Sequence, residues 1–429
     1  MTSIALEWLN LIVRWIHVIA AIMWIGDSFL FVWLDSQLKP PRKPREGAVT
    51  GEMWMVHSGG FYEVVKRRYL RPDELPETLH WFKWEAYSTW ISGFLLLGVV
   101  YYLGGGVFLI DSRSSLSLGG AIALSLALLA GAWLLYDALW SSPLSRRPAL
   151  AAGVSFALVV AAAFTLTHLL SGRGAFIHLG AMLGTIMVAN VWRRIIPAQT
   201  QMLAATKASQ PVDTSLGARA KMRSLHNHYL TLPVLFTMLS NHFPSTYGNP
   251  LNWLVLVLLV ILGAAVKYVM NFRGGSNRWV VLGGVAALVA VVALTMRVPG
   301  PASAAGSFRD APPVSFQTAQ AIIERRCITC HAAHPSNPSF PQPPNGVILE
   351  DPERIRSLAP RIMVRAVVTR TMPLGNLTGM TEEERALLGA WVAQGARLEG
   401  GPGPAGPAAV EVMLADLTPP AGCAGRAAG

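Results

Sequence analysis

Long apolar stretches alternate with short polar segments along the first 298 residues. A helix needs about 20 mostly apolar residues to cross a hydrocarbon core of roughly 30 Å. About eight stretches approach that length, near residues 5–34, 82–103, 117–140, 149–170, 175–196, 227–243, 251–271 and 279–297. The pattern predicts an all-α polytopic membrane bundle. Its sixth span is the weakest, because it is short and contains Pro233.

The pattern changes after residue 298. Residues 299–313 are rich in Pro, Ala, Gly and Ser, a composition that indicates a linker. Residues 314–399 predict a small soluble domain. Residues 400–429, rich in Gly, Pro and Ala, predict a disordered tail. The expected organisation is therefore a membrane domain over 1–298, followed by a tethered soluble domain.

Composition supports the membrane assignment. The chain is 52% hydrophobic and 14% charged, whereas a soluble domain has about 25% charged residues. The formal net charge of +11 does not indicate nucleic acid, because the basic residues form short clusters between apolar runs. These clusters are expected to fix the orientation of the spans and to contact membrane lipid.

Basic residues gather in the segments 35–79 and 197–225. Few of them occupy the alternate loops, at 104–116, 171–174 and 244–250. Loops rich in Lys and Arg stay in the cytoplasm, so the two basic segments are expected there. An even number of spans then places both termini and the soluble domain on the outer side. The N-terminus has no basic n-region or cleavage site, so the first span is expected to be retained.

The soluble domain contains a CxxCH motif formed by Cys327, Cys330 and His331. In such a motif the two thiols bond covalently to haem vinyl groups, and the adjacent imidazole binds the iron. A zinc site is the alternative, but no second Cys/His pair follows at zinc spacing. The motif therefore predicts a covalent haem c, with His331 as one iron ligand. Cys423 is left over and is expected to be inert.

A methionine is expected as the sixth iron ligand. Met372, which precedes a proline, is the first choice because an extended Met-Pro loop can cover the open haem face; Met380 is the alternative, and Met363 is expected to pack in the core. A helix should follow, with Thr381 as N-cap and Glu384 at the capping-box position. This layout resembles the small mono-haem cytochrome c fold, which implies an electron carrier.

Ionisable residues inside membrane spans are costly and therefore mark candidate functional sites. The first span carries Arg14, His17 and Asp27. With the expected topology, one group lies at or outside the midplane, namely His17, His168, His178 and His242. A second group lies at the inner ends of the spans, namely His80, Glu85, His226 and His228. Facing imidazoles in a helical bundle can hold a b-type haem. The alternative is that these are interfacial histidines that bind water.

Several long stretches resemble one family. They are EWLNLIVRWIHVIAAIMWIG, LHWFKWEAYSTWISGFLLL, SGRGAFIHLGAMLGTIMVANVWRRIIPAQ and HNHYLTLPVLFTMLSNHFPSTYGNPLNWLVL. They are similar to the membrane-integral bacterial urate oxidases, or urate hydroxylases, which carry a C-terminal cytochrome c. The resemblance implies oxidation of urate to 5-hydroxyisourate in purine degradation, in a bacterial inner membrane with the cytochrome in the periplasm. The positions in these stretches are His17, His80, Glu85, His178, Asn190, His226 and His242.

Hydroxylation of urate with oxygen from water requires a general base and an electron sink. Glu85 is the expected base, with His226 as its partner and His80 beside it. Haem c lies outside while the substrate arises inside, and roughly 30 Å of bilayer is too far for one electron hop. The depth of the histidines therefore predicts a b-type haem, with His17 as a ligand and His178 or His242 as the other.

Urate is a flat anion rich in hydrogen-bond donors and acceptors, so its pocket should offer a cation, an amide and an aromatic face. Lys83, Trp84 and Gln199 are candidates near the inner boundary. Residues 57–70 are expected to fold over this mouth, with Gly59 and Gly60 in a tight turn.

Two other functions fit part of the pattern. The bundle could be a non-catalytic electron-transfer anchor, such as a quinol-oxidising cytochrome subunit, or a transporter whose haem senses redox state. Polar clusters at both ends of the spans exceed what electron transfer needs, and a tethered haem has no coupling role in transport. The expected partners are urate and a downstream periplasmic cytochrome or terminal oxidase.

Overall fold

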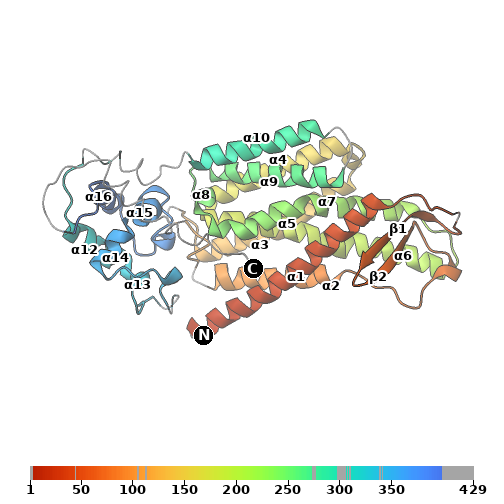
Figure 1. The fold of residues 1–429 in the computed structure, drawn as a ribbon, viewed down its shortest axis with the longest axis horizontal. Coiled ribbons are helices and arrows are strands. Elements are labelled where there is room, and N and C mark those ends of the chain that lie inside the picture. The colour runs from red at the N-terminus through yellow and green to blue at the C-terminus, as the bar shows by residue number, and fades with distance from the viewer. Residues whose placement is uncertain are drawn as a thin grey trace, which may run out of the picture.

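The computed structural model describes residues 3–43, 45–103, 106–111, 114–272, 277–296, 306, 308, 311–337, 340 and 342–398. Most of the expected linker, the expected tail and Cys423 lie outside these residues. A long helical bundle meets a group of shorter helices, the C-terminal unit, at one end (Figure 1). We call this end of the bundle proximal, and the end beside β1, β2 and α6 distal.

The long helices of the bundle follow the apolar pattern. They are α1 (Ser3–Gln37), α2 (Trp84–Leu97) continued by η2 (Gly98–Tyr102), α3 (Leu118–Ser141), α4 (Pro148–Leu169), α5 (Gly172–Asn190) continued by η4 (Val191–Ile195) and α6 (Ile196–Lys207), α7 (Thr214–Leu239), α9 (Asn252–Asn271) and α10 (Arg278–Met296). Short turns of helix connect them: η1 (Pro72–Glu74), η3 (Pro143–Arg146), η5 (Ser240–His242) and α8 (Pro244–Tyr247).

Six helical segments of the described residues are long and apolar enough to cross a membrane. They are Ile4–Gln37, Leu118–Ser141, Pro148–Leu169, Gly172–Lys207, Asn252–Asn271 and Arg278–Met296, and they coincide with six of the predicted spans. The other two predicted spans are also helical, but α2 has only 14 residues and the first half of α7 is polar. The described residues are therefore mostly helical, as predicted, and their six candidate membrane-spanning helices are consistent with a membrane protein, although eight spans were expected.

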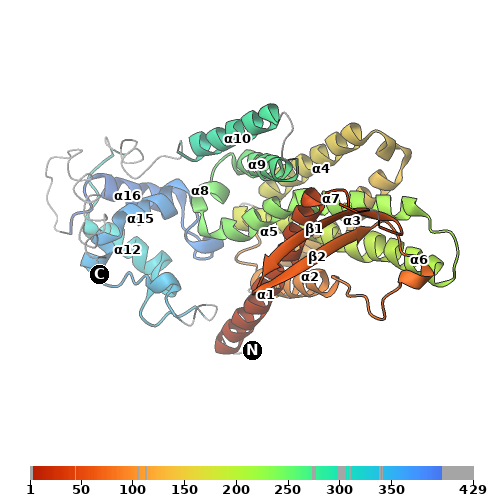
Figure 2. The same cartoon turned by 45° about the vertical axis from the view of Figure 1, so that its right-hand side comes forward.

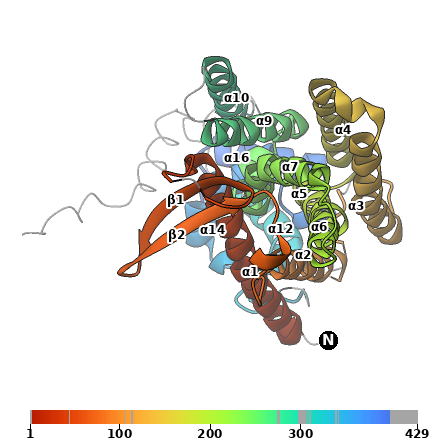
Figure 3. The ribbon, with the colours of Figure 1, turned by 90° about the vertical axis from the view of Figure 1, so that its right-hand side faces the viewer.

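Helix α5 forms the centre of the bundle. Viewed from the distal end, α5 and α7 lie between α3 and α4 on one side and α9 and α10 on another (Figure 3). Small residues allow this close packing: a β-carbon at Gly180 of α5 would lie 1.9 Å from Oγ1 of Thr237 in α7. The outer faces expose large apolar side chains such as Trp15 and Trp279, as expected for surfaces that contact lipid.

The basic segment after α1 contains an antiparallel hairpin of β1 (Val49–His57) and β2 (Gly60–Arg67). The tight turn predicted at Gly59 and Gly60 is present, with positive φ at Ser58 and Gly59. The strands themselves were not expected. Ion pairs such as Lys66–Asp35 attach the hairpin to the distal end of α1. Whether it covers a substrate mouth stays a prediction.

The C-terminal unit has its own apolar core. Its helices are α12 (Phe316–Arg326), α13 (Ile328–His331), η6 (Pro344–Gly346), α14 (Pro352–Ser357), α15 (Ala359–Ile362), η7 (Met363–Val368), η8 (Leu374–Asn376) and α16 (Glu382–Ala393). Two views show them gathered beyond α8 (Figures 1 and 2). Helix α12 packs against α16, where Phe316 meets the buried Trp391. The predicted capping box of Thr381 and Glu384 is present.

Candidate functional site

The CxxCH motif occupies the end of α12 and the short helix α13. Cys327 caps α12, while Cys330 and His331 lie in α13. Nδ1–H of His331 donates a hydrogen bond to the carbonyl oxygen of Val347 (3.0 Å), which leaves Nε2 free to bind a metal. A haem-binding histidine is normally oriented by such a bond. Burial lowers the pKa of His331, which favours the neutral, ligating form.

Both motif cysteines are free thiols. Burial, and then the neighbouring Cys330, raise the pKa of Cys327 to about 12. Burial also raises the pKa of Cys330. These shifts are opposite to the lowered pKa of the attacking thiol in redox-active CxxC pairs. The arrangement fits covalent attachment of a haem.

The methionines differ in their surroundings. Met363 and Met380 are both part of the apolar core of the C-terminal unit, with 0% and 3% of their surfaces exposed. Met372 is outside that core and only partly buried, in the loop between η7 and η8. Its backbone is fixed, because its amide donates to Arg365 and its carbonyl accepts from Arg385. Met372 is therefore the methionine with a side chain available to an iron.

The loop that carries Met372, residues 369–376, lies against the proximal end of the bundle. A β-carbon at Gly375 would lie 2.9 Å from the carbonyl oxygen of Val107. Thr371 likewise approaches Gly248, which follows α8. The candidate sixth ligand of the haem is therefore in the part of the C-terminal unit that touches the bundle.

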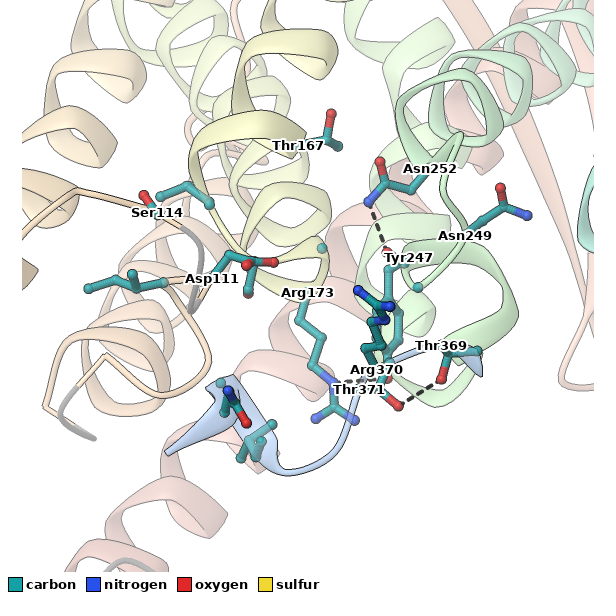
Figure 4. A pocket seen from close by; sticks show the side chains of 18 of the residues that line it. Asp111, Ser114, Thr167, Arg173, Tyr247, Asn249, Asn252, Thr369, Arg370 and Thr371 are labelled. Atoms are coloured by element: carbon teal, nitrogen blue, oxygen red, sulfur yellow. Dashed lines mark hydrogen bonds between the residues drawn. The ribbon is translucent and has the colours of Figure 1, made fainter. Parts of the chain in front are cut away.

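A polar cavity of about 900 Å³ lies along this contact (Figure 4). The bundle contributes Arg173, whose Nε donates to the hydroxyl of Tyr247 (2.9 Å) while its guanidinium stacks on that ring. The C-terminal unit contributes Thr369, Arg370 and Thr371. This wall can hold water and small anions between the two parts of the protein.

Histidines predicted near the outer ends have unequal environments. His17 is partly buried, and its Nδ1–H donates to the carbonyl of Thr89 (3.0 Å), leaving Nε2 without a hydrogen bond to any described residue. His178 is fully buried with both nitrogens engaged, by the carbonyl of Gly174 (2.7 Å) and the hydroxyl of Tyr102 (3.3 Å). His168 and His242 are exposed. Nδ1 of His168 also donates to a backbone carbonyl, that of Phe164 (2.7 Å), so His17 and His168 share the donor arrangement of a metal-bound imidazole, and of these two His17 is the partly buried one.

Glu85, the predicted base, lies at the start of α2. Its Oε1 is 4.0 Å from Nε2 of His80, as the sequence suggested, and its Oε2 is buried without a hydrogen bond to any residue in the described ranges. Asp27 of α1 is near enough for its charge to act on both side chains. Trp84 is 66% exposed and Gln199 is also exposed, so neither is enclosed with this pair.

His226 belongs to a different group, near the distal end of α3, α5 and α7, which we call the α3–α7 cluster. Its members are Tyr136, Asp137, Asn190, Arg194, Arg223, His226 and Asn227. The structure therefore does not join Glu85 to His226 by a hydrogen bond or ion pair. His226 instead packs on Trp140, with ring centroids 4.1 Å apart.

Tyr136 connects the neutral members of the cluster. Its hydroxyl accepts a hydrogen bond from Nδ2 of Asn190 (3.1 Å) and lies 2.7 Å from Nδ1 of His226. In the tautomer in which Nδ1–H of His226 donates to this hydroxyl oxygen, Nε2 carries the free lone pair and is the nitrogen that can take up a proton. Asn190 also donates to Oδ1 of Asn227 (2.8 Å), so the tyrosine and both amides form one network.

Asp137 connects the charged members. It accepts from Nε of Arg194 (2.8 Å) and from Nη2 of Arg223 (3.0 Å). Two cations therefore share one carboxylate. Arg223 is 4% exposed and Asn190 is 0% exposed, yet Nη1 of Arg223 and Oδ1 of Asn190 have no hydrogen-bond partner within the described part of the chain. Leaving such a group unsatisfied costs about 1–3 kcal/mol, so a native structure needs a reason for it.

Sequence reasoning did not single out Arg223, Tyr136 or Asp137. Asp137 could have been found as a lone carboxylate in an apolar span. Lys267 of α9 is likewise a single ionisable residue in an apolar span. It is fully buried, and its Nζ lies 3.4 Å from the centre of the Phe29 ring without a hydrogen-bond acceptor among the described residues.

In the part of the chain that the structure describes, no group of three or more His, Cys, Asp or Glu side chains could hold a metal ion.

Among known families, the model described as the urate oxidase N-terminal domain matches residues 3–297. The chain belongs to the urate oxidase N-terminal family. No curated protein and no solved structure matches it.

Membership assigns the chain to an oxidoreductase family that acts on urate, and this part of the resemblance is confirmed. The matched residues contain the whole bundle, including the α3–α7 cluster, Glu85 and His17. They end before the C-terminal unit, so the CxxCH motif lies outside the urate oxidase domain of the family.

Proposed function

We propose that this protein oxidises urate to 5-hydroxyisourate in the bundle and passes the electrons to a haem c held by Cys327, Cys330 and His331. The observation that carries the proposal is the contact between the Met372 loop and the bundle, because it joins a urate oxidase domain to a candidate haem site. The resemblance to small cytochromes c and the orientation of His331 support a mono-haem cytochrome c.

The reaction needs no dioxygen. A C–O bond forms between C5 of urate and the oxygen of water, two electrons leave the purine ring and two protons are released. Cys327, Cys330 and His331 would hold a haem that can take up these electrons one at a time, and a downstream periplasmic cytochrome or terminal oxidase would receive them. Removing a proton from water calls for a general base. His226, held by Tyr136, and Glu85, paired with His80, are the two candidate bases.

Distance favours a relay inside the bundle. Asn190 lies 17 residues beyond Arg173 along α5, so the α3–α7 cluster is roughly 25 Å from the proximal end. We propose that His17 helps to hold a b-type haem between the α3–α7 cluster and the proximal end, with His178 or His242 as the second ligand. Such a group would accept single electrons, and the contacts of His17 fit it better than those of the fully hydrogen-bonded His178.

The distribution of Lys and Arg supports an orientation with the distal end in the cytoplasm of a bacterium. The C-terminal unit and both chain ends would then lie in the periplasm. Haem attachment and electron delivery on that side are consistent with this arrangement.

Turnover with an external acceptor tests the proposed reaction. Purified full-length protein is mixed with urate and ferricytochrome c without dioxygen. The proposal expects loss of urate absorbance, two acceptors reduced per urate and no hydrogen peroxide when air is admitted. Dependence on dioxygen, or reduction by quinol but not by urate, would contradict it and favour an oxygen-linked oxidase or an electron-transfer anchor, respectively.

A further inference from the structure

Two buried polar atoms without a hydrogen-bond partner among the described residues lie in one part of the bundle. Nη1 of Arg223 needs an acceptor, and Oδ1 of Asn190 needs a donor. Both side chains surround Tyr136: the guanidinium carbon of Arg223 is 5.0 Å from the ring centre, and Nδ2 of Asn190 is 3.1 Å from the hydroxyl. One small molecule offering both an acceptor and a donor can satisfy the two atoms together.

The charge of the cluster selects the class of molecule. Arg223 and Arg194 both pair with the one carboxylate of Asp137, but the Arg223 side chain is 5% exposed and that of Arg194 is 44% exposed. Nη1 of the buried Arg223 has no acceptor among the described residues, and a buried charged donor without a partner is costly. A monoanion would remove this cost, and a guanidinium is well suited to a planar anion because its N–H groups can donate in parallel.

Aromatic rings complete the surroundings. His226 packs against Trp140, and its ring also lies beside that of Tyr136. A flat heterocycle can stack on such rings, whereas a phosphate or a halide gains nothing from them. The combination favours a planar heterocyclic anion with ring N–H donors and carbonyl acceptors.

We propose that the α3–α7 cluster is the urate-binding site, with Arg223 and Asn190 as the residues that recognise the purine anion. This rests on the proposed function. Arg223 donates from Nη1 to a carbonyl or deprotonated nitrogen of urate, and Oδ1 of Asn190 accepts from a ring N–H. Nε2 of His226 then faces the same molecule as a candidate base. The exposed Trp84 and Gln199 have no part in this site.

Binding can be measured without turnover. The full-length protein is first reduced with dithionite, so that no haem can accept electrons, and labelled urate is added in equilibrium dialysis. The wild-type protein should bind one urate per chain. Arg223→Gln should weaken binding at least tenfold and Arg223→Lys by less, because lysine keeps the charge without the planar pair of donors. Arg219→Gln, a change on the same helix that leaves the cluster intact, should bind as the wild type does.

Asn190→Asp is the second variant. The new carboxylate has the same shape but cannot donate to Tyr136 and Asn227 as the amide does, so haem content and thermal unfolding of both variants are measured beside binding, and the folded variant should lose urate binding at least tenfold. Wild-type affinity in Arg223→Gln or in folded Asn190→Asp would overturn the assignment. Lys267→Met removes the other buried cation of the bundle, and a loss of urate binding in this variant but not in the two cluster variants would also overturn it. Binding by the reduced protein without any oxidation in the turnover assay would overturn the proposed reaction while leaving the site in place.

Discussion

Gly375 of the C-terminal unit lies so close to Val107 of the bundle that a β-carbon added to it would be 2.9 Å from the Val107 carbonyl oxygen. The neighbouring Met372 is the methionine whose side chain is outside the apolar core. In the proposed function, electrons would cross between bundle and haem at this contact, and a side chain at position 375 would widen it.

Gly375→Ala should slow urate-dependent haem reduction, by about tenfold if the barrier rises by 1.4 kcal/mol. Gly379→Ala is the matched control. Both glycines have positive φ (56° and 65°), so both variants carry similar backbone strain, but the nearest atom to a β-carbon at Gly379 is Nη1 of Arg326 at 3.7 Å. Stopped-flow spectroscopy measures the rates, and equal slowing in both variants would assign the effect to strain alone.

Met372→Ala should leave haem c covalently attached but remove its sixth ligand. The visible spectrum should become high-spin and the reduction potential should fall, since a methionine ligand raises it. Met380→Leu should lower thermal stability by less than about 1.5 kcal/mol, because it exchanges similar volumes in the core, and should keep the low-spin spectrum. A low-spin spectrum that survives in Met372→Ala but not in Met380→Leu would exchange the two assignments.

Stability of the C-terminal unit should depend on pH through Glu384. Burial raises the pKa of this carboxyl, but hydrogen bonds from Arg326 and from the Thr381 amide outweigh it and hold the pKa below its usual range. The stabilisation is therefore complete above the unfolded pKa of about 4.3 and is lost as pH falls through the lower folded value.

Glu384→Gln should consequently cost about 1–3 kcal/mol of stability at pH 7 and flatten the acid limb of the unfolding profile. Chemical denaturation of the full-length protein, followed by the haem c Soret band, measures this. Glu383→Gln, an exposed neighbour in the same helical turn, should keep the wild-type profile. An acid limb of unchanged steepness in Glu384→Gln would show that other carboxyls control it.

His17→Ala should abolish the haem that acid acetone extracts from the purified protein, while covalent haem c remains. The reason is that Nε2 of His17 is free of hydrogen bonds to the described residues while Nδ1 is fixed by Thr89. His168→Ala, an exposed histidine of α4, serves as the control and should retain the extractable haem. A wild-type protein without any extractable haem would refute the relay.

The sequence predicted the parts of the structure that depend on local pattern. The lengths of the apolar stretches predicted where the long helices lie. The spacing of Thr381 and Glu384 predicted the capping box, because both residues act within one helical turn. The preference for Met372 over Met380 as the iron ligand also rested on local order, since an extended Met-Pro loop can cover a haem face, and it stays a prediction.

The arrangement of the candidate site could not be predicted in the same way. His226 and His228 are two residues apart on α7, so they point about 200° apart around the helix. His226 meets Tyr136 of α3, whereas His228 meets Ser28 and Phe29 of α1. Their positions along the predicted span placed both histidines at one end of the bundle. Only the rotation of α7 about its axis decides which neighbours each histidine meets. That rotation separates His226 from Glu85.

The most direct test of the account is to mix oxidised, full-length protein with urate in the absence of dioxygen and of any external acceptor. The account predicts that the absorption bands of ferrous haem c appear during the first turnover, as electrons pass from the bundle through the Met372 loop. A haem c that stays ferric with urate, yet is reduced promptly by dithionite, would contradict it.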